Sequence, residues 1–420
     1  MNIPQGYKQT EFGPIPSDWG VCTFQNVLTT FSSGATPYRG IPEYYKGNVR
    51  WISSGELNYN KIFDTIEHIS QQAVRNTNLR VHQSGTFLMA ITGLEAEGTR
   101  GRCAFVGAPA TTNQSCLAIN GTERMCTEYL FWFYRMWGQY LAFKYCQGTK
   151  QQSYTANIVK NLPIYGPKDI AEQKAIAEAL GDIDGLIAAL DKKIAKKRLI
   201  KQGAMQQLLT GKKRLPGFSD PWVEKKFSDL YRYASEGGTP DTNNMRFYAN
   251  GDVPFVKIED TETKYIESCN SFITSEGINN SSAWIVPVNS IIYTNGATIG
   301  NVSINKIPVA TKQGILGIIP SSIINLEFMY YLLLSQNFKR EVDSRQAKGT
   351  FATIILKSLD EIPIYLPLNQ MEQIAIATIL SDMDKEIADL EAQRDKYRLL
   401  KSGMMQKLLT GQIRLKINRI

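Results

Sequence analysis

Two stretches of the chain carry apolar residues at a helical spacing. In residues 171–215 these positions are separated alternately by four and three residues, and residues 371–415 repeat the pattern. Such spacing predicts long helices whose narrow apolar stripe pairs with another helix, as in a coiled coil. About 40 residues at ~1.5 Å each would form a rod of ~60 Å. The positions are Ile176, Leu180, Ile183, Ile187, Leu190, Ile194, Ala204 and Leu208, then Ile376, Leu380, Met383, Ile387, Leu390, Tyr397, Met404 and Leu408.

The two stretches are also similar in sequence. Residues 204–215 read AMQQLLTGKKRL, and residues 404–415 read MMQKLLTGQIRL. Over 171–215 and 371–415 more than half of the aligned residues are identical, without a gap. Just upstream, Leu162–Tyr165 is matched by Ile362–Tyr365. The chain is therefore a tandem duplication.

The remainder of each half repeats more faintly, through short matches around Ser33–Pro37 and Gly237–Pro240, Thr112–Gln114 and Thr311–Gln313, and Gln147–Thr149 and Lys348–Thr350. Each half therefore consists of a variable domain followed by a well-matched helical segment. We expect variable domains at residues 1–165 and 212–366, and repeat helices at 166–211 and 367–420.

The variable domains carry short strand-like runs separated by Gly, Asn and Pro. Each domain also has one helix candidate near its end, Glu128–Tyr145 and Leu326–Val342. The pattern predicts an α+β fold class, with two mixed α/β domains separated by the long helices. The strand candidates are Val49–Ser53, Thr86–Ile91, Val253–Ile258, Ser290–Thr294, Val302–Ile304 and Gly314–Ile319.

The connection between the helices bears on their direction. A pseudo-two-fold relation suits a duplicated chain, so we expect the two helices to form an antiparallel intramolecular coiled coil, with one variable domain at each end. A parallel pair would put both domains at the same end. The alternative to pairing is a separate surface helix on each domain; the long apolar stripe in both copies favours pairing.

Composition adds a few limits. A chain of 420 residues with 43% apolar residues is large enough for two or more domains. It has no apolar run of membrane-spanning length, no signal-peptide pattern at its start, and six cysteines without a CxxC pair. A reduced cytoplasmic protein is the simplest interpretation. The net charge of +8 favours a polyanionic partner, although this signal alone is weak.

Several catalytic and nucleotide-binding motifs are absent. The sequence lacks a Pro-Pro pair, and therefore the tetrapeptide of methyltransferases that act on the amino groups of bases. It also lacks a GxxxxGK[ST] phosphate-binding loop, an HExxH zinc motif and a GxSxG nucleophile motif. The two histidines leave little material for a metal site.

One loose nuclease pattern is present. Asp241 after Pro240, with Glu262 and Lys264, satisfies PD…ExK, in which two carboxylates hold Mg²⁺ and a lysine polarises the attack. The pattern is short, and Pro240 already repeats the turn proline Pro37. A divergent Mg-dependent nuclease is therefore the alternative function. A coiled-coil scaffold without a DNA role is a third hypothesis.

The whole arrangement resembles the specificity (S) subunit of type I restriction–modification systems. The resemblance rests on a duplicated variable region followed by an LP-x-Y-like element, P-x-x-x-x-EQ-x-x-I-x-x-x-L-x-D-x-D and a final LLTG. It covers the whole chain. In the first copy the residues are Leu162, Pro163, Pro167, Glu172, Gln173, Ile176, Leu180, Asp182 and Asp184, and in the second Ile362, Pro363, Pro367, Glu372, Gln373, Ile376, Leu380, Asp382 and Asp384.

This resemblance implies a function without catalysis in the chain itself. Each variable domain would be a target recognition domain that reads one half of an asymmetric split DNA target, and the coiled coil would set the spacing. Two methyltransferase subunits would dock on the chain, and restriction subunits that act as motor and nuclease would join them. S-adenosylmethionine, ATP and Mg²⁺ would belong to those partners.

DNA-reading candidates in the first domain lie in two stretches. Residues 92–102 are polar and glycine-rich and end with Arg100 and Arg102 on either side of a glycine. Residues 147–154 add Lys150, Gln151 and Gln152. Such side chains can reach base edges and phosphates. The alternatives are a plain β-turn for the first stretch and a solvated linker for the second.

The second domain has equivalents in both stretches. Residues 294–301 contain Asn295 and Asn301, and residues 345–351 contain Arg345 and Lys348. The same turn and linker alternatives apply. Weaker candidates for phosphate contacts are Arg39, Lys46, Arg50 and Lys257.

Two features of the repeat helices permit more than one interpretation. A run of six basic residues between Lys192 and Lys201 could attract DNA, but an ordinary solvated coiled-coil face is favoured. The repeated pairs Glu172–Gln173 and Glu372–Gln373 could mark methyltransferase docking, or could place first-turn residues that match the helix dipole.

Overall fold

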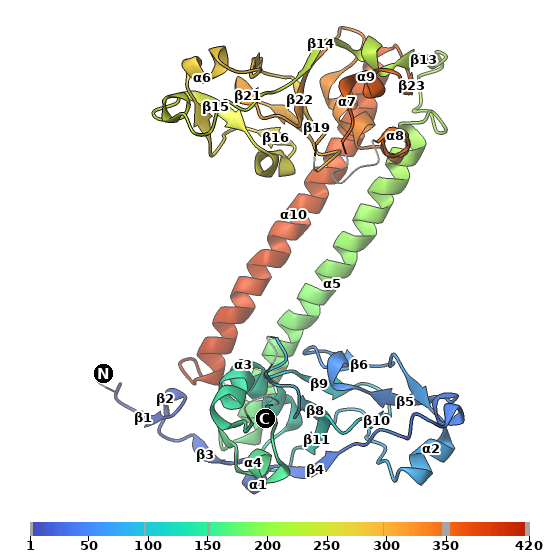
Figure 1. Cartoon of the computed structure of the whole chain (residues 1–420). Helices are drawn as coiled ribbons and strands as arrows, with labels where there is room; N and C mark the ends of the chain where they lie inside the picture. The colour runs from blue at the N-terminus through green and yellow to red at the C-terminus, as the bar shows by residue number, and fades with distance from the viewer. Residues whose placement is uncertain (1–2, 96–97, 149–151, 297, 347–352, 416–420) are drawn as a thin grey trace. The chain divides into compact units, whose positions relative to one another are not determined.

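The computed structural model describes residues 3–95, 98–148, 152–296, 298–346 and 353–415. The chain divides into two compact units. We call Met1–Leu190 with Gln393–Ile420 unit 1, and Asp191–Ala392 unit 2. The boundaries fall inside the two longest helices, α5 (Ile170–Leu208) and α10 (Gln370–Leu409), so each unit contains a globular domain and a part of both helices (Figure 1).

The globular part of unit 1 is built on a five-stranded sheet in the order β4-β11-β8-β9-β6. Only β6 and β9 pair in parallel in this sheet. A smaller sheet has the order β10-β5-β7, and the β1–β2 hairpin begins the described chain. The strands are β1 (Tyr7–Thr10), β2 (Gly13–Pro16), β3 (Gly20–Thr23), β4 (Thr29–Ser33), β5 (Val49–Ile52), β6 (Lys61–Ile62), β7 (His68–Ile69), β8 (Phe87–Ala90), β9 (Cys103–Val106), β10 (Thr111–Thr112), β11 (Cys116–Asn120) and β12 (Pro163–Gly166).

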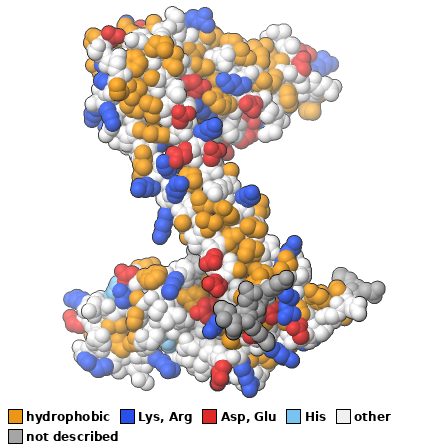
Figure 2. Space-filling view, turned by 180° about the vertical axis from the view of Figure 1, so that it is seen from behind, with side chains coloured by type: hydrophobic (Ala, Val, Ile, Leu, Met, Phe, Trp, Pro, Cys, Tyr) orange, Lys and Arg blue, Asp and Glu red, His pale blue; other side chains and the backbone are white. Residues whose placement is uncertain are grey.

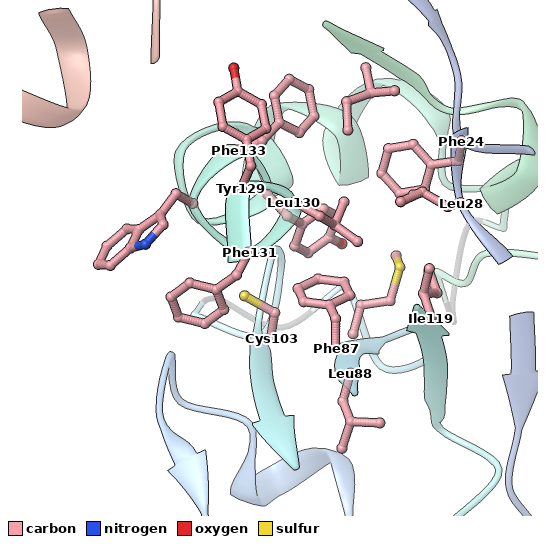
Figure 3. Packing of buried hydrophobic residues seen from close by; sticks show 14 of the residues in the cluster. Phe24, Leu28, Phe87, Leu88, Cys103, Ile119, Tyr129, Leu130, Phe131 and Phe133 are labelled. Carbon is pink, nitrogen blue, oxygen red and sulfur yellow. The ribbon is translucent and has the colours of Figure 1, made fainter. Parts of the chain in front are cut away.

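Helix α3 (Thr127–Tyr145) covers the large sheet of unit 1. Figure 3 shows Phe131 of this helix beside Cys103 of β9, with Phe87 of β8 close by. The rings of Phe105 and Phe131 stack with centroids 4.7 Å apart. Every residue of β8 is buried, because α3 covers one face and further apolar side chains the other. The other short helices are α1 (Phe24–Val27), α2 (Gln71–Asn76) and α4 (Ala156–Asn161).

Unit 2 repeats this plan with a five-stranded sheet β14-β22-β19-β20-β16 and a smaller sheet β17-β15-β21-β18. Its strands are β13 (Val223–Lys226), β14 (Tyr231–Glu236), β15 (Val253–Val256), β16 (Tyr265–Ile266), β17 (Phe272–Ile273), β18 (Ile285–Val286), β19 (Ile291–Thr294), β20 (Val302–Asn305), β21 (Val309–Thr311), β22 (Ile315–Pro320) and β23 (Pro363–Leu366). Its helices are α6 (Ser275–Asn279), α7 (Leu326–Leu333), α8 (Gln336–Arg345) and α9 (Leu356–Asp360). All six strand candidates from the sequence are therefore confirmed within two residues at each end.

One helix prediction is wrong. The sequence pattern predicted a single helix over Leu326–Val342, but the structure breaks it into α7 and α8. Ser335 stands between them in an extended conformation, and its side chain accepts a hydrogen bond from the backbone N–H of Phe338. Serine is a strong N-cap residue, so it starts a new helix where the apolar pattern alone would continue the old one.

The long helices pair antiparallel in each unit. In unit 1, Lys401 of α10 binds Asp184 of α5, and Arg414 beyond α10 binds Glu172 at the start of α5. In unit 2 the pairs are Lys201–Asp384 and Arg214–Glu372, which are the same positions displaced by 200 residues. In each unit a later residue in one helix meets an earlier residue in the other, which confirms the predicted antiparallel coiled coil.

The repeated Glu–Gln pair is buried in both units. Gln173 accepts a hydrogen bond from the N–H of Cys126 at 2.9 Å and donates to the carbonyls of Arg124 and Pro167. Gln373 makes the equivalent bonds to Asn325, Ile323 and Pro367. These side chains attach each repeat helix to the start of the helix that covers the sheet. They offer no surface for docking, so a structural role is favoured over the docking interpretation.

The repeated helix ending LLTG also has a structural explanation. Gly211 and Gly411 have φ values of +68° and +70°, a conformation that ends helices and favours glycine. A side chain at Gly211 would meet the Trp222 ring at 3.2 Å. Each ending therefore turns the chain so that the following arginine reaches the buried glutamate of the other helix. No helix among the described residues is long and apolar enough to cross a membrane.

Candidate nucleic-acid interface

Three loops of unit 1 meet on one surface. The β8–β9 loop (residues 91–102), the turn at 112–115 and the segment at 147–154 are far apart in sequence. The N–H of Ile91 donates to the carbonyl of Ser115 at 2.9 Å, and the N–H of Tyr154 donates to the carbonyl of Ile91 at 2.8 Å. Leu94 likewise donates to the carbonyl of Gln152 at 3.1 Å. We call the described residues of these three loops loop cluster 1.

The structure brings together two of the DNA-reading candidates in this cluster. The Arg100 guanidinium donates to the side-chain oxygen of Gln152 at 3.2 Å. The backbone N–H of Gln152 donates to the Glu95 carboxylate at 2.9 Å, and Arg102 donates to the carbonyl of Gly98. Arg100, Arg102 and Gln152 are all half-buried and thus partly open to a ligand. Lys150 and Gln151 lie outside the described residues.

Unit 2 has an equivalent loop cluster 2. Its parts are the described residues of the β19–β20 loop (295–296 and 298–301), the turn at 311–314, and the described residues on either side of the segment 347–352. The N–H of Asn295 donates to the carbonyl of Gly314 at 2.9 Å, and the N–H of Ile354 donates to the carbonyl of Asn295 at 3.0 Å. The same three positions therefore meet in both halves, although their sequences differ. Lys348 lies outside the described residues.

The side chain of Asn295 is turned inward. It is only 4% exposed, and its amide nitrogen donates to the carbonyl of Ile354 at 3.1 Å and lies 3.5 Å from the Glu236 carboxylate. The same carboxylate accepts from the N–H of Gly314 at 2.7 Å. This geometry favours a role for Asn295 in holding the loops together over direct contact with a base.

The other two candidates of the second domain are partly exposed. Asn301 donates from its amide to the Thr261 hydroxyl at 3.1 Å, so its side chain is positioned by a neighbouring loop. Arg345, near the end of α8, donates to the carbonyl and the carboxylate of Glu341 one turn earlier. That carboxylate offsets part of the arginine's charge.

The turn in each cluster carries exposed polar residues that are not among the DNA-reading candidates from the sequence pattern. Gln114 is exposed in unit 1 and accepts a hydrogen bond from the Thr36 hydroxyl. Lys312 and Gln313 are exposed in unit 2. The faint Thr-x-Gln repeat was the signal available for these residues, but only the structure places the turn beside the other two loops.

The weaker candidates lie on or beside the smaller sheets. Arg39 donates two hydrogen bonds to Glu67, at 2.6 and 2.8 Å, and these bonds hold the pKa of Glu67 below its usual value. Arg50 lies 3.5 Å from Asp64, and Lys46 lies 3.9 Å from Glu43. Nearby carboxylates thus reduce the local positive charge. The remaining candidate, Lys257, precedes η5 (Ile258–Glu262), and its N–H donates to Asp260 at 2.9 Å.

Three of the six basic residues in the run on the first repeat helix take part in the helix pairing. Lys197 binds Glu386 at 2.7 Å, Arg198 binds Glu391, and Lys201 binds Asp384. These pairs agree with the favoured interpretation of a coiled-coil face. The other three residues of the run, Lys192, Lys193 and Lys196, are exposed.

Nothing supports the nuclease alternative. Lys264 is held by Glu327 at 2.7 Å and by the hydroxyls of Tyr331 and Ser381 at 3.1 and 3.0 Å, in a packed site against helices α7 and α10. Asp241 accepts from the N–H of Asn243 in a local turn. Among the residues that the structure describes, no group of three or more His, Cys, Asp or Glu side chains could hold a metal ion.

Comparison with known proteins identifies the family. The sequence pattern of the type I restriction modification DNA specificity domain matches the chain twice, over residues 16–197 and 219–397. The chain belongs to this family. Each of its two specificity-domain matches contains one of the loop clusters described above.

Relatives of the family resemble the chain over its whole length. The type I restriction enzyme MjaIX specificity subunit of Methanocaldococcus jannaschii is 22% identical and the match covers 97% of this chain and 96% of that protein. A putative MjaX specificity subunit of the same organism is 26% identical, with 98% and 97% covered. A crystal structure of a type I restriction–modification S subunit from M. genitalium shares the fold, with a TM-score of 0.60, 14% identity, and 100% and 99% covered.

Proposed function

We propose that this chain is the DNA sequence-specificity subunit of a type I restriction–modification complex. The observation that carries the proposal is the double match to a DNA specificity domain, in which each match contains one three-loop cluster. Because the two clusters have different side chains, each recognition domain would read a different half of a split double-stranded DNA target. The helices α5 and α10, each of which runs through both units, would set the spacing between the halves.

The chain would contribute recognition and leave catalysis to its partners. S-adenosylmethionine would belong to methyltransferase subunits, and ATP and Mg²⁺ to restriction subunits. The sequence supports this assignment, because it lacks the motifs for these chemistries. In addition, Lys264, the lysine of the loose PD…ExK pattern, is held in a packed ion pair with Glu327.

Two methyltransferase subunits would dock on the repeat helices. Large apolar side chains are exposed on these helices, as Figure 2 shows on one face of the molecule. Leu199 is 68% exposed and Leu399 is 77% exposed, and both are followed by a further exposed apolar residue, Ile200 or Leu400. Exposed apolar groups at matching positions favour contact with a partner protein, and the duplication supplies two equal surfaces for two copies of it.

The test is a map of methylated bases. The chain is expressed with the methyltransferase encoded beside it, in a host without other modification, and methylated adenines are located by genome sequencing. We expect an asymmetric motif in two parts, whose centres lie about 10 bp apart if both domains read the same face of DNA. An ungapped motif, or no modification by a purified soluble complex, would contradict the two-reader proposal.

A single substitution tests loop cluster 1. Arg100→Ala should weaken binding of the complex to a duplex that carries the mapped motif by about 1–3 kcal/mol, because one cationic contact is removed. The measurement is fluorescence anisotropy over a series of salt concentrations, since loss of a phosphate contact also lowers the salt dependence. Arg75→Ala on α2 is the matched control, because Arg75 is exposed outside the cluster. Equal affinities for all three proteins would remove Arg100 from the interface.

A further inference from the structure

In unit 1, the tip of the β1–β2 hairpin fills a groove beside helix α3. Phe12 at this tip is almost fully buried. Its ring centroid lies 5.5 Å from that of Phe133, 5.1 Å from that of Trp137 and 5.2 Å from that of Tyr165. The hairpin therefore places one aromatic side chain between α3 and strand β12.

The neighbouring carboxylate is bound at the rim of the same groove. Glu11 accepts hydrogen bonds from the Lys144 ammonium at 2.7 Å and from the Tyr145 hydroxyl at 2.8 Å. On the other side of the hairpin, the Tyr7 hydroxyl donates to the carbonyl of Gly411 at 3.0 Å. The occupant of this groove is thus an aromatic residue next to a carboxylate, presented by a turn.

Unit 2 contains the same framework. Strand β23 pairs with β13 in the register that β12 has with β3, so Tyr365 lies opposite Glu224 as Tyr165 lies opposite Val21. Trp222 packs on Tyr365 with centroids 5.6 Å apart, and Trp19 packs on Tyr165 at 6.1 Å.

In unit 2, however, the corresponding groove is open. It has a volume of about 420 Å³ and is lined by residues that include Leu209, Thr210, Phe338, Arg340, Ile364 and Tyr365. Tyr365 is 50% exposed, whereas the equivalent Tyr165 is fully buried.

The difference has two structural causes. Residues 210–222 run directly from the end of α5 to β13 and form no hairpin, so among the described residues no counterpart of Phe12 covers Tyr365. In addition, the break between α7 and α8 replaces the continuous helix that carries Trp137 and Tyr140 in unit 1. Phe338, the aromatic residue of α8, packs inward on Phe227 with centroids 5.6 Å apart.

The rim of the open groove is basic, as it is around Glu11 in unit 1. Arg340 binds the neutral side chain of Asn337 at 3.1 Å, and Lys339 lines a second hollow of about 250 Å³ that shares Thr210, Ser335 and Asn337 with the first. Glu341 also lines the groove, and its carboxylate is paired with Arg345. Apolar lining with a cationic rim matches the chemistry of the hairpin tip that fills the groove in unit 1.

We propose that this groove of unit 2 is a docking site for a segment of a partner protein that presents an aromatic side chain beside a carboxylate. The aromatic ring packs on Tyr365 and Ile364, and the carboxylate binds Arg340 or Lys339. That the partner is a methyltransferase subunit rests on the proposed function, in which the chain assembles with such subunits. Because the hairpin occupies the groove of unit 1, this site makes the two otherwise similar units unequal.

Photo-cross-linking in the reconstituted complex tests the proposal. A benzophenone amino acid replaces Tyr365, and in a matched control it replaces Tyr233, which is 52% exposed on β14 of the same unit. We expect position 365 to cross-link a methyltransferase peptide that contains an aromatic residue next to Asp or Glu, with at least about tenfold higher yield than position 233. Equal yields, or a cross-link to DNA, to a second copy of this chain or to a peptide without that pair, would overturn the proposal.

A groove-filling variant gives an independent measurement. Asn337 is exposed and lines the groove, so Asn337→Trp should fill it and weaken assembly with the methyltransferase by about tenfold or more. Asn279→Trp on α6 is the control for an added surface tryptophan. Unchanged assembly of the Asn337→Trp protein, with an unchanged melting temperature, would contradict docking. Failure of the proposed function would instead appear as loss of the two-part methylation motif in the wild-type complex.

Discussion

Exchanging the first recognition domain should change one half of the methylated DNA motif and leave the other half unchanged. The exchange takes residues 24–162 from another member of the family and keeps β3 and β12. These two strands pair from Gly20↔Gly166 to Thr23↔Pro163, and they connect the domain to the repeat helices. Because loop cluster 1 lies wholly inside the exchanged segment, its base contacts are replaced together. Genome-wide mapping of methylated adenines measures the result.

The matched exchange in the second domain takes residues 227–362, between β13 and β23, which pair in the same way. This protein should change only the other half of the motif. The length of the gap should remain the same in both, because neither exchange alters α5 or α10. A change in both halves after either exchange would mean that the two loop clusters do not read DNA independently.

Arg214→Met should lower the free energy of unfolding of unit 2 by about 3 kcal/mol, because it leaves a buried carboxylate without its charged partner. Glu372 is fully buried and accepts from Arg214 at 2.6 and 2.9 Å and from the Trp222 ring N–H at 3.3 Å. Arg214 itself is only 27% exposed, so solvent screens the pair weakly. Urea unfolding followed by tryptophan fluorescence measures the change.

Two controls separate this effect from a general loss of charge. Lys226→Met removes a cation from an exposed pair with Glu361 in the same unit and should leave stability unchanged. Arg214→Met combined with Glu372→Met should recover much of the lost stability, because no unpaired charge is then buried. If Arg214→Met unfolds at the wild-type urea concentration, the repeated arginine after LLTG does not hold the helix ends together.

The repeat helices illustrate how much local pattern can predict. Their apolar spacing predicted α5 and α10, and the internal repeat predicted that both would occupy the same place in each half. The repeat favoured an antiparallel over a parallel direction, and the pairs Lys401–Asp184 and Lys201–Asp384 confirm it. The same pattern failed at Ser335, where the capping preference of one polar residue outweighed the apolar periodicity.

The DNA-reading candidates show where sequence reasoning ended. The sequence selected residues 92–102 and 147–154 separately, and only the fold places Arg100 beside Gln152. It also selected Asn295 as an exposed amide, whereas the fold turns this side chain inward against Ile354. Exposure of a polar loop residue depends on backbone contacts between distant segments, and no local pattern encodes those contacts.

The sequence by itself determined the duplication, the two long helices, the α+β class of both domains and the family of the chain. These features depend on residue spacing and on short repeated motifs, which are properties of contiguous segments. The tertiary structure alone decided which loops meet, that the Glu–Gln pairs are buried, and that one groove is filled by the hairpin while its counterpart is open. Those outcomes depend on packing between residues far apart in the chain, so only the folded structure reveals them.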